Sequence, residues 1–313
     1  MSDNQLSRYG AISKVLPLMN PGAKVFFVGP SAAAWYGDFI NVFGPDSEGG
    51  NRVFNDLDTA ISDSNVVASR GDVILVLPGY SETITGTDIV VDKAGLSIIG
   101  IGQGSLMPTI SHNNAVAEVS IAADNVLWKG FRHRADVTSV AIGIEIEDGV
   151  DYTAIKDCLF DVVATGTDEF TASIHMVNDN TGTVIEGNTF HMGLAAAVAA
   201  IHMDADTADT VIRKNYADGD YSTAVIVGDT TLSTGLLIED NLLINGLASN
   251  IGTEPGIELL TGTTGIIRRN DIVCNLATKA ASIVADTCFL FENHYNEDIT
   301  GTGGLIGTAS ADD

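Results

Sequence analysis

Short apolar strings that end in a charge and an asparagine recur along most of the chain. The stretch Gly182–Phe190, GTVIEGNTF, is one of them. Related strings begin at Asn125, Thr153, Thr210, Leu236, Gly265 and Phe289, about 23 to 30 residues apart. A second run rich in β-branched residues precedes each string, and the repeats lack the period of an amphipathic helix. Repeats of this length, built of short strands, predict an all-β fold: a parallel β-helix of about eight coils over residues 71–299.

Stacked coils place equivalent residues in columns, because each strand pairs with its counterpart about 4.8 Å away. The asparagine column is predicted at a bend, since Asn tolerates the left-handed conformation and its amide can bond the Asn of the next coil. Two charged columns precede it, and charged neighbours within each alternate in sign. They contain Lys156, Glu186, Arg213, Glu239 and Arg268, and Lys129, Asp157, Gly187, Lys214, Asp240, Arg269 and Glu292. Exposed pairs contribute only about 0.2–1 kcal/mol each, so their expected role is to set register.

Strand alternation sends two apolar columns to opposite faces. The predicted core column contains Leu127, Ile155, Ile185, Ile212, Ile238 and Ile267. The outward column contains Val126, Ala154, Val184, Val211, Leu237 and Ile266. Monomers seldom expose so long an apolar patch. We therefore expect a subunit interface between copies of this chain at Val126, Val184, Val211, Leu237 and Ile266.

A short capping helix is predicted within residues 51–70, where apolar residues recur at helical spacing before the first strand at Gly71. These residues are Val53, Phe54, Leu57, Ala60 and Ile61. A solenoid needs caps because its edge strands otherwise template aggregation. At the other end, the Gly-rich and acidic residues 300–313 are predicted to form a flexible tail or a strand donated to a neighbouring copy.

Residues 1–50 carry no repeat and are predicted to form a separate N-terminal arm. The arm has one strand-like run, KVFFVG from Lys24, and a group of aromatic residues: Phe26, Phe27, Trp35, Tyr36, Phe39 and Phe43. Because the coils have their own cap, we interpret these aromatics as an anchor to another protein. The alternative is that the arm folds over the first coil as an extended cap.

The amino-acid composition limits which kinds of partner the protein can bind. Lys+Arg number 15 and Asp+Glu 41, so the formal net charge is −26, which repels nucleic acid and acidic membrane surfaces. The sequence has neither a secretory signal nor an apolar stretch of roughly 18 residues, so we expect synthesis in a cytoplasm and no membrane partner. Cys158, Cys274 and Cys288 lack C-x-x-C spacing and are predicted to be core residues.

Three aspartates could supply a glycosidase carboxylate pair, but they lie in a predicted turn, where solvated acids are common. They are Asp204, Asp206 and Asp209. A basic cluster of Lys129, Arg132, His133 and Arg134 is interpreted as an ion-paired loop, with an acidic partner as the alternative. We assign no catalytic residue and no cofactor.

One outward column on the second strand contains residues that can bind metal or titrate near neutral pH. It reads Glu145, His175, His202, Ile226 and Glu258. Such side chains about 4.8 Å apart could converge on zinc or sense acid. Since Ile226 continues the column and no fourth ligand is evident, we interpret them as hydrated or subunit-contact side chains and assign no metal ligand.

The coils and their asparagine ladder resemble the right-handed parallel β-helices of the pectin-lyase type. The stretch from Asn51 to Thr83, which joins NRVFNDLDTAISDS to GDVILVLPGYSET, resembles the cap and first coil of β-helical virion proteins of tailed bacteriophages. Such proteins serve as tailspikes, fibres or capsid decorations, commonly as trimers, so the resemblance implies a homotrimer in a virion. We place it on the outer capsid surface, with the major capsid protein or another virion protein as partner, because the sequence shows no catalytic constellation and its N-terminal arm could seat the coils on another protein. We expect a non-enzymatic capsid decoration or cement protein. The alternative is a tail-associated spike or fibre that binds or depolymerises polysaccharide.

Overall fold

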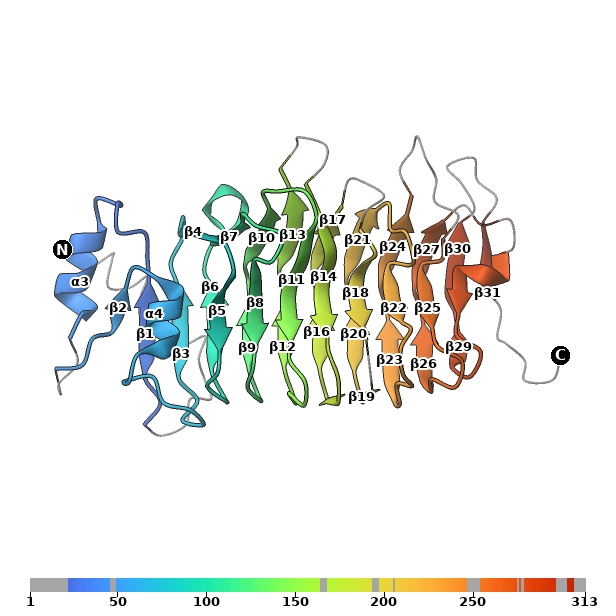
Figure 1. The fold of residues 1–313 in the computed structure, drawn as a ribbon, viewed down its shortest axis with the longest axis horizontal. Helices are drawn as coiled ribbons and strands as arrows, with labels where there is room; N and C mark the ends of the chain where they lie inside the picture. The colour runs from blue at the N-terminus through green and yellow to red at the C-terminus, as the bar shows by residue number, and fades with distance from the viewer. Residues whose placement is uncertain are drawn as a thin grey trace.

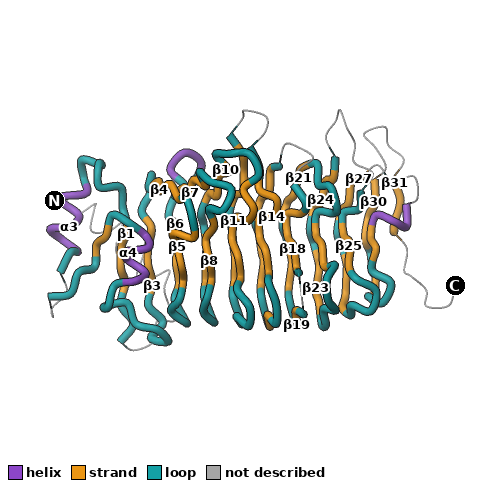
Figure 2. The backbone as a smooth tube through the Cα atoms, in the orientation of Figure 1, coloured by secondary structure: helices purple, strands orange, loops and turns teal. Residues whose placement is uncertain are grey.

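The protein is a right-handed parallel β-helix of about nine turns, which confirms the predicted fold class. The computed structural model describes residues 22–45, 49–163, 168–192, 197–204, 206–246, 254–274, 276, 279–296 and 303–306. Successive coils stack side by side along the long axis, with helices α3 (Tyr36–Phe43) and α4 (Leu57–Ser62) at the N-terminal end (Figure 1). In the described residues the strands form three long sheets of 11, 10 and 8 strands (Figure 2).

Each coil contributes one strand to each long sheet in turn, so every sheet joins distant segments of the chain. The first sheet contains, in spatial order, β2 (Val53–Phe54), β1 (Val25–Val28), β3 (Val73–Val76), β6 (Ser97–Gly100), β9 (Leu127–Lys129), β12 (Ala154–Lys156), β16 (Val184–Glu186), β20 (Val211–Arg213), β23 (Leu236–Glu239), β26 (Gly265–Arg268) and β29 (Phe289–Phe291). The second contains β4 (Ser81–Ile84), β7 (Thr109–His112), β10 (Arg132–Ala135), β13 (Leu159–Val162), β17 (Thr189–His191), β21 (Tyr216–Gly219), β24 (Leu242–Asn245), β27 (Asp271–Cys274), β30 (Asn293–Asn296) and β31 (Gly303–Ile306).

The third sheet carries the histidines of the outward column. It contains β5 (Thr87–Val91), β8 (Glu118–Ile121), β11 (Val140–Ile146), β14 (Phe170–Met176), β18 (Ala199–Met203), β22 (Ile226–Gly228), β25 (Ile257–Leu259) and β28 (Ile283–Val284). A small fourth sheet pairs β15 (Asn180–Thr181) with β19 (Thr207–Ala208). Within the described residues, the helical elements are α3 (Tyr36–Phe43), α4 (Leu57–Ser62) and the 3₁₀ turns η1 (Gly104–Leu106) and η2 (Lys279–Ser282). None of the helices in the described ranges is long and apolar enough to cross a membrane.

The predicted asparagine ladder is present at the bend between the first and second sheets. Each side-chain amide donates to the Oδ1 of the Asn in the next coil, over 3.1 Å from Asn188 to Asn215 and 2.9 Å from Asn241 to Asn270. The same amide also donates to a carbonyl of the preceding coil, as Asn188 does to Ile155. These buried polar groups are therefore satisfied by stacking, and a slipped coil would leave them unpaired.

The left-handed conformation lies one residue before the asparagine, so its predicted place on Asn is wrong. Asp157, Lys214 and Asp240 have φ between 52° and 56°, and Gly187 takes φ 71° in the same column. The asparagine is instead needed for its amide, because both its oxygen and its nitrogen bond neighbouring coils. At the bend, therefore, one residue adopts the left-handed backbone conformation and the asparagine after it supplies the side-chain hydrogen bonds between coils.

The alternating charges form the predicted ion pairs. Glu186 bonds Lys156 on one side and Arg213 on the other, at 3.0 Å to each. These hydrogen bonds, with Arg213 the larger contributor, lower the pKa of Glu186 to about 2. Glu239 likewise bonds Arg268 and Arg269 at 2.8 and 2.9 Å. The charged columns therefore stack as the sequence predicted from Lys156 onward.

The predicted register is wrong by one residue in the coil of β9. Leu127 pairs with Ala154 and Trp128 with Ile155, so Trp128 enters the core and Leu127 faces outward. Lys129 consequently lies beside Lys156, and its ammonium reaches diagonally to Asp157 at 3.1 Å. Leu and Trp are both apolar, and sequence alone could not tell which of them was buried.

The core of this coil holds a polar chain of three side chains that the sequence did not reveal. His112 and His133 are fully buried, with 3.2 Å between Nε2 of His112 and Nδ1 of His133. Trp128 Nε1 donates to His133 Nε2 at 3.0 Å, and His112 Nδ1 lies 2.9 Å from the Ala117 carbonyl oxygen. One set of tautomers satisfies every contact: His112 donates from Nδ1, His133 donates from Nδ1, and both rings are neutral.

The N-terminal residues form a double cap. Helix α4 contacts β1, β2, β3 and β5 and buries Leu57, Ala60 and Ile61, with Asp56 accepting from the Thr59 amide at its N-terminus. The capping helix predicted within residues 51–70 is thus confirmed, although Val53 and Phe54 belong to strand β2. Strand β1 lies between β2 and β3 in the first sheet and pairs with both. Next to it, the Lys24 amide donates to buried Asp72 at 2.8 Å.

At the opposite end, strand β31 pairs antiparallel with β30 of the same chain. Residues 303–306 of the predicted tail therefore cover an edge of the second sheet, and this strand is not donated to a neighbouring copy. The remainder of 300–313 lies outside the described residues. The residues of the predicted arm before Gly22 also lie outside them.

The buried histidines predict an acid-dependent loss of stability. Burial lowers the pKa of His112 to about 4, and burial and His112 together lower that of His133 well below 6.5. Below pH 6.5 the two histidines bind protons in the unfolded chain but stay neutral in the folded chain, so stability falls as pH falls toward 4. Relative to His112→Gln, the wild type should lose about 1 kcal/mol more per pH unit on average over this window, with a limiting slope of about 1.4 kcal/mol per unit in its middle. Urea unfolding at several pH values gives the free energy of unfolding of both proteins. If this free energy fell equally with pH in the wild type and in His112→Gln, the prediction would be wrong.

Candidate functional site

The first sheet exposes an apolar stripe along its outer face. The stripe consists of Leu127, Ala154, Val184, Val211, Leu237, Ile266 and Phe289, which pair in direct register on successive strands. Val126 is only 1% exposed and packs in the core, so its predicted place in the interface is wrong. The other four predicted interface residues are partly exposed, with Ile266 the most exposed of them at 37%. Phe289, which the prediction did not include, extends the stripe and is 67% exposed.

The charge ladder flanks the stripe, which widens at its C-terminal end. Phe291 occupies the ladder position next to Arg268 and is 44% exposed. The rings of Phe289 and Phe291 are stacked, with centroids 6.4 Å apart. Two aromatic side chains therefore extend the apolar surface where the ladder ends.

Most of the predicted anchor residues are buried within the protein. Phe26 is fully buried in the main core, and Phe27, Tyr36 and Phe39 pack in a second cluster against Val53, Val73, Leu75 and Leu77. Phe43 is partly buried against the same cluster, and Trp35 alone of the six is largely exposed, at 41%. The interpretation that these aromatics do not complete the core is wrong. The arm residues from Gly22 to Pro45 instead fold over the first coil as an extended cap.

The third sheet carries an outward column of histidines and acids. Glu145, His175, His202 and Glu258 occupy it as predicted, but Val227 and not Ile226 continues the column. Ile226 pairs with Ile201 in the core. Burial raises the pKa of Glu258, and the neighbouring carboxylates of Glu254 and Asp229 raise it further. The face thus concentrates negative charge around two imidazoles.

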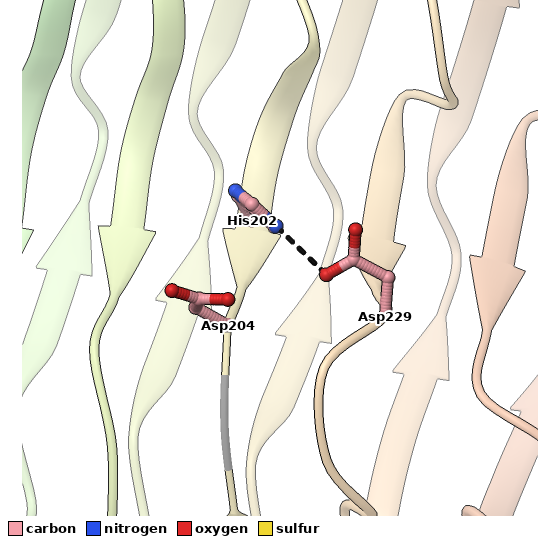
Figure 3. A group of neighbouring side chains, drawn as sticks. All are labelled: His202, Asp204 and Asp229. Carbon is pink, nitrogen blue, oxygen red and sulfur yellow. Dashed lines mark hydrogen bonds and ion pairs between the residues drawn. The ribbon is translucent and has the colours of Figure 1, made fainter.

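Two aspartates just beyond the strand ends complete what we call the histidine–aspartate cluster: His175, His202, Asp204 and Asp229. Figure 3 shows Asp204 and Asp229 beside the ring of His202, on neighbouring coils. His202 Nε2 lies 3.1 Å from Asp229 Oδ1, and His175 Nε2 lies 3.7 Å from Asp204 Oδ2. One ligand atom from each of His202, Asp204 and Asp229 falls within 4.8 Å of the others. The aligned strings AAIHMD and AVIVGD, which both end in aspartate, carried the signal for this grouping.

The three aspartates considered as a hydrolytic site are not brought together. Asp204 belongs to the histidine–aspartate cluster, and Asp209 lies at a left-handed turn with φ 52°. Asp206 lines a surface groove with Asp179, over strands β15 and β19. The described lining of this groove contains two carboxylates and no aromatic side chain.

The predicted basic cluster is divided between the surface and the core. Arg132 bonds Asp161, and Arg134 lies 3.5 Å from Asp136, so both guanidinium groups are ion-paired as expected. They lie on strand β10, not in a loop, and the alternation of that strand points His133 inward. All three cysteines are free and buried, and burial raises the pKa of each thiol, which agrees with core residues.

No family model matches the chain, and no curated protein or solved structure is significantly similar to it. The chemistry of this protein must therefore be inferred from its own residues.

Two aromatic substitutions distinguish residues of the N-terminal segment that pack in the core from those on its surface. Phe26→Ala should destabilise the protein by about 3–5 kcal/mol, because it opens a cavity in the main core. Trp35→Ala should cost about 1 kcal/mol or less, since much of that ring is already in water. Thermal and denaturant unfolding compare the two variants. Equal melting of Phe26→Ala and wild type would show that the segment does not cap the coils.

Proposed function

We propose that this protein is a non-enzymatic structural component of a bacteriophage particle, a homotrimeric decoration protein on the outer capsid surface. The observation that carries the proposal is the apolar stripe of the first sheet, which runs along successive coils beside the charge ladder. A stripe of this length needs a cover, because large contiguous apolar patches on soluble proteins mark interaction surfaces. The resemblance of Asn51–Thr83 to phage virion proteins supports the biological setting.

The charge ladder supports self-association over binding of an acidic ligand. Lys156, Arg213, Arg268 and Arg269 already bond carboxylates within the chain. Their pairing leaves the apolar residues as the main source of binding free energy on this face. Three parallel solenoids related by a threefold axis would bring the same stripe of each copy to the centre of the assembly.

The N-terminal end is the proposed point of attachment to the capsid. Since most arm aromatics are buried, the contact is assigned to the outer surface of α3, where Trp35, Ile40 and Val42 are 41%, 37% and 45% exposed. Aromatic and aliphatic side chains that are already ordered lose little entropy on binding and are common interface anchors. The solenoid would then project from the particle along its long axis.

The second candidate is a tail-associated protein that binds or cleaves polysaccharide. The groove with Asp179 and Asp206 favours it, because glycosidases use a pair of carboxylates. Release of reducing or unsaturated ends from host polysaccharide, with loss of that activity in Asp206→Asn, would support this candidate over the first.

The location is tested on particles purified from cells that produce the protein. Antibodies to the chain should label capsids in electron micrographs, and peptides of the chain should be present in the purified particles. Labelling of tails would transfer the proposal to the second candidate. A protein that stays in the lysate and never sediments with particles would overturn both.

The oligomer is tested by charged substitutions in the stripe. Val211→Asp with Leu237→Asp should convert trimers into folded monomers, because association would bury uncompensated carboxylates. Leu242→Asp is the matched control, since Leu242 is also outward and 37% exposed but belongs to the second sheet. Sedimentation velocity gives the mass and circular dichroism the fold. Trimers that survive the double substitution would remove the stripe as the interface.

A further inference from the structure

The histidine–aspartate cluster combines the donor atoms that a transition metal prefers. It offers two imidazole nitrogens and two carboxylates from three successive coils: His175 on β14, His202 and Asp204 on or just after β18, and Asp229 just after β22. Zinc binds histidine nitrogen and carboxylate oxygen at about 2.0–2.2 Å, usually with four ligands in a tetrahedron. Ligand atoms of such a site are about 3.4 Å apart. The ligand atoms of His202, Asp204 and Asp229 all lie within 4.8 Å of one another, with 3.1 Å between His202 Nε2 and Asp229 Oδ1. His175 Nε2 lies 3.7 Å from Asp204 Oδ2 and is the candidate for a fourth ligand.

The orientation of His175 presents a nitrogen toward the carboxylates. Its Nδ1 lies 3.2 Å from Glu145 Oε2, so the proton of a neutral ring is held on Nδ1 by that carboxylate. Nε2 then carries a lone pair directed toward Asp204 at 3.7 Å. In that tautomer, this nitrogen and the Asp204 carboxylate can both coordinate a cation that lies between them. Metal-binding histidines commonly have their other ring nitrogen held by a carboxylate in this way.

The stacking of Asp204 on Asp229 points the same way. Met203 pairs with Gly228, so the two aspartates that follow are direct neighbours on adjacent coils. In the charge ladder from Lys156 onward, direct neighbours alternate in sign. Like charges placed directly opposite each other destabilise a sheet. A divalent cation would convert this repulsion into a shared attraction, and Glu118, Glu145 and Glu258 on the same sheet add to the negative potential that draws it in.

We propose that the histidine–aspartate cluster binds one divalent transition-metal cation, with zinc as the probe, and that the bound ion clamps three successive coils together. The site is independent of the apolar stripe, because it lies on the third sheet and the stripe lies on the first. Its chemistry excludes calcium as the preferred ion, since calcium takes oxygen ligands and two of these four donors are nitrogen.

Binding is measured on the untagged full-length protein after removal of metals with a chelator. Titration with zinc should give one ion per chain by elemental analysis after gel filtration. At free zinc about 100-fold above the dissociation constant, the melting temperature should rise by about 3–5 °C. Calcium at the same concentration should give no rise. A chain that retains no zinc and melts unchanged, or one that responds to calcium and not zinc, would overturn the proposal.

Two substitutions locate the ion. His202→Ala and Asp229→Asn should each weaken zinc binding at least tenfold and abolish the zinc-dependent rise in melting temperature. Asp229→Asn also removes one of two like charges, so the metal-free variant should melt no lower than the metal-free wild type. That combination separates a ligand from a residue needed only for folding. If both variants bind zinc as tightly as the wild type, the ion lies elsewhere and the assignment is wrong.

The chain supplies a matched control in a second histidine–aspartate pair. His294 Nδ1 lies 2.9 Å from Asp271 Oδ1, and both side chains are exposed. His294→Ala should leave zinc binding unchanged. Cobalt(II) gives a direct reading of the ligands: tetrahedral nitrogen and oxygen coordination should produce intense visible absorption in the wild type and in His294→Ala, and His202→Ala should show only the weak absorption of hydrated cobalt. A cobalt spectrum that disappears instead in His294→Ala would place the ion at that pair and overturn the proposal.

Discussion

Backbone pairing between successive coils is the constraint on which the rest of this structure depends. Apart from β31, which pairs antiparallel with β30, the neighbouring strands of the long sheets are parallel. Each inner strand thus bonds the strands on either side of it, nearly without shifts of register. A residue therefore has the same kind of neighbour at almost every level, and the properties of a position belong to its column. Since a shift of one residue would exchange the inner and outer faces of a strand, the columns also exclude alternative registers.

Two polar columns enforce that register by different means. The asparagine ladder is buried, and each amide is satisfied only by the coils directly beside it, as Asn215 is by Asn241 at 3.0 Å and by the Ile185 carbonyl at 3.0 Å. Its loss would leave buried polar groups without partners, which costs more than an exposed bond contributes. The charge ladder is more exposed and weaker, and it adds a penalty for like-sign neighbours. The buried hydrogen bonds of the asparagine ladder therefore contribute most to fixing the register, and the charge ladder adds a smaller preference for the same register.

Each function that we propose is assigned to a different outer face or end of the β-helix. The first sheet presents an apolar stripe for self-association, the third presents the histidine–aspartate cluster, and the N-terminal end presents α3 to a partner. A solenoid allows this division because each sheet extends along the whole stack, so a surface can be lengthened by repetition without disturbing the core. The cap at the N-terminal end is then both a structural element, through Phe26 and Phe39, and a surface, through Trp35.

The sequence by itself determined the coils, the asparagine ladder and the charge columns from Lys156 onward, because repetition exposes any position whose chemistry is constant. The tertiary structure decided what repetition does not encode. It buried Trp128 beside His133, placed Phe26 in the core and brought Asp204 next to Asp229. Trp128 was ambiguous because its neighbour Leu127 is equally apolar. The arm and the cluster were ambiguous because non-repeating segments and turn residues acquire their partners only when the chain closes around them.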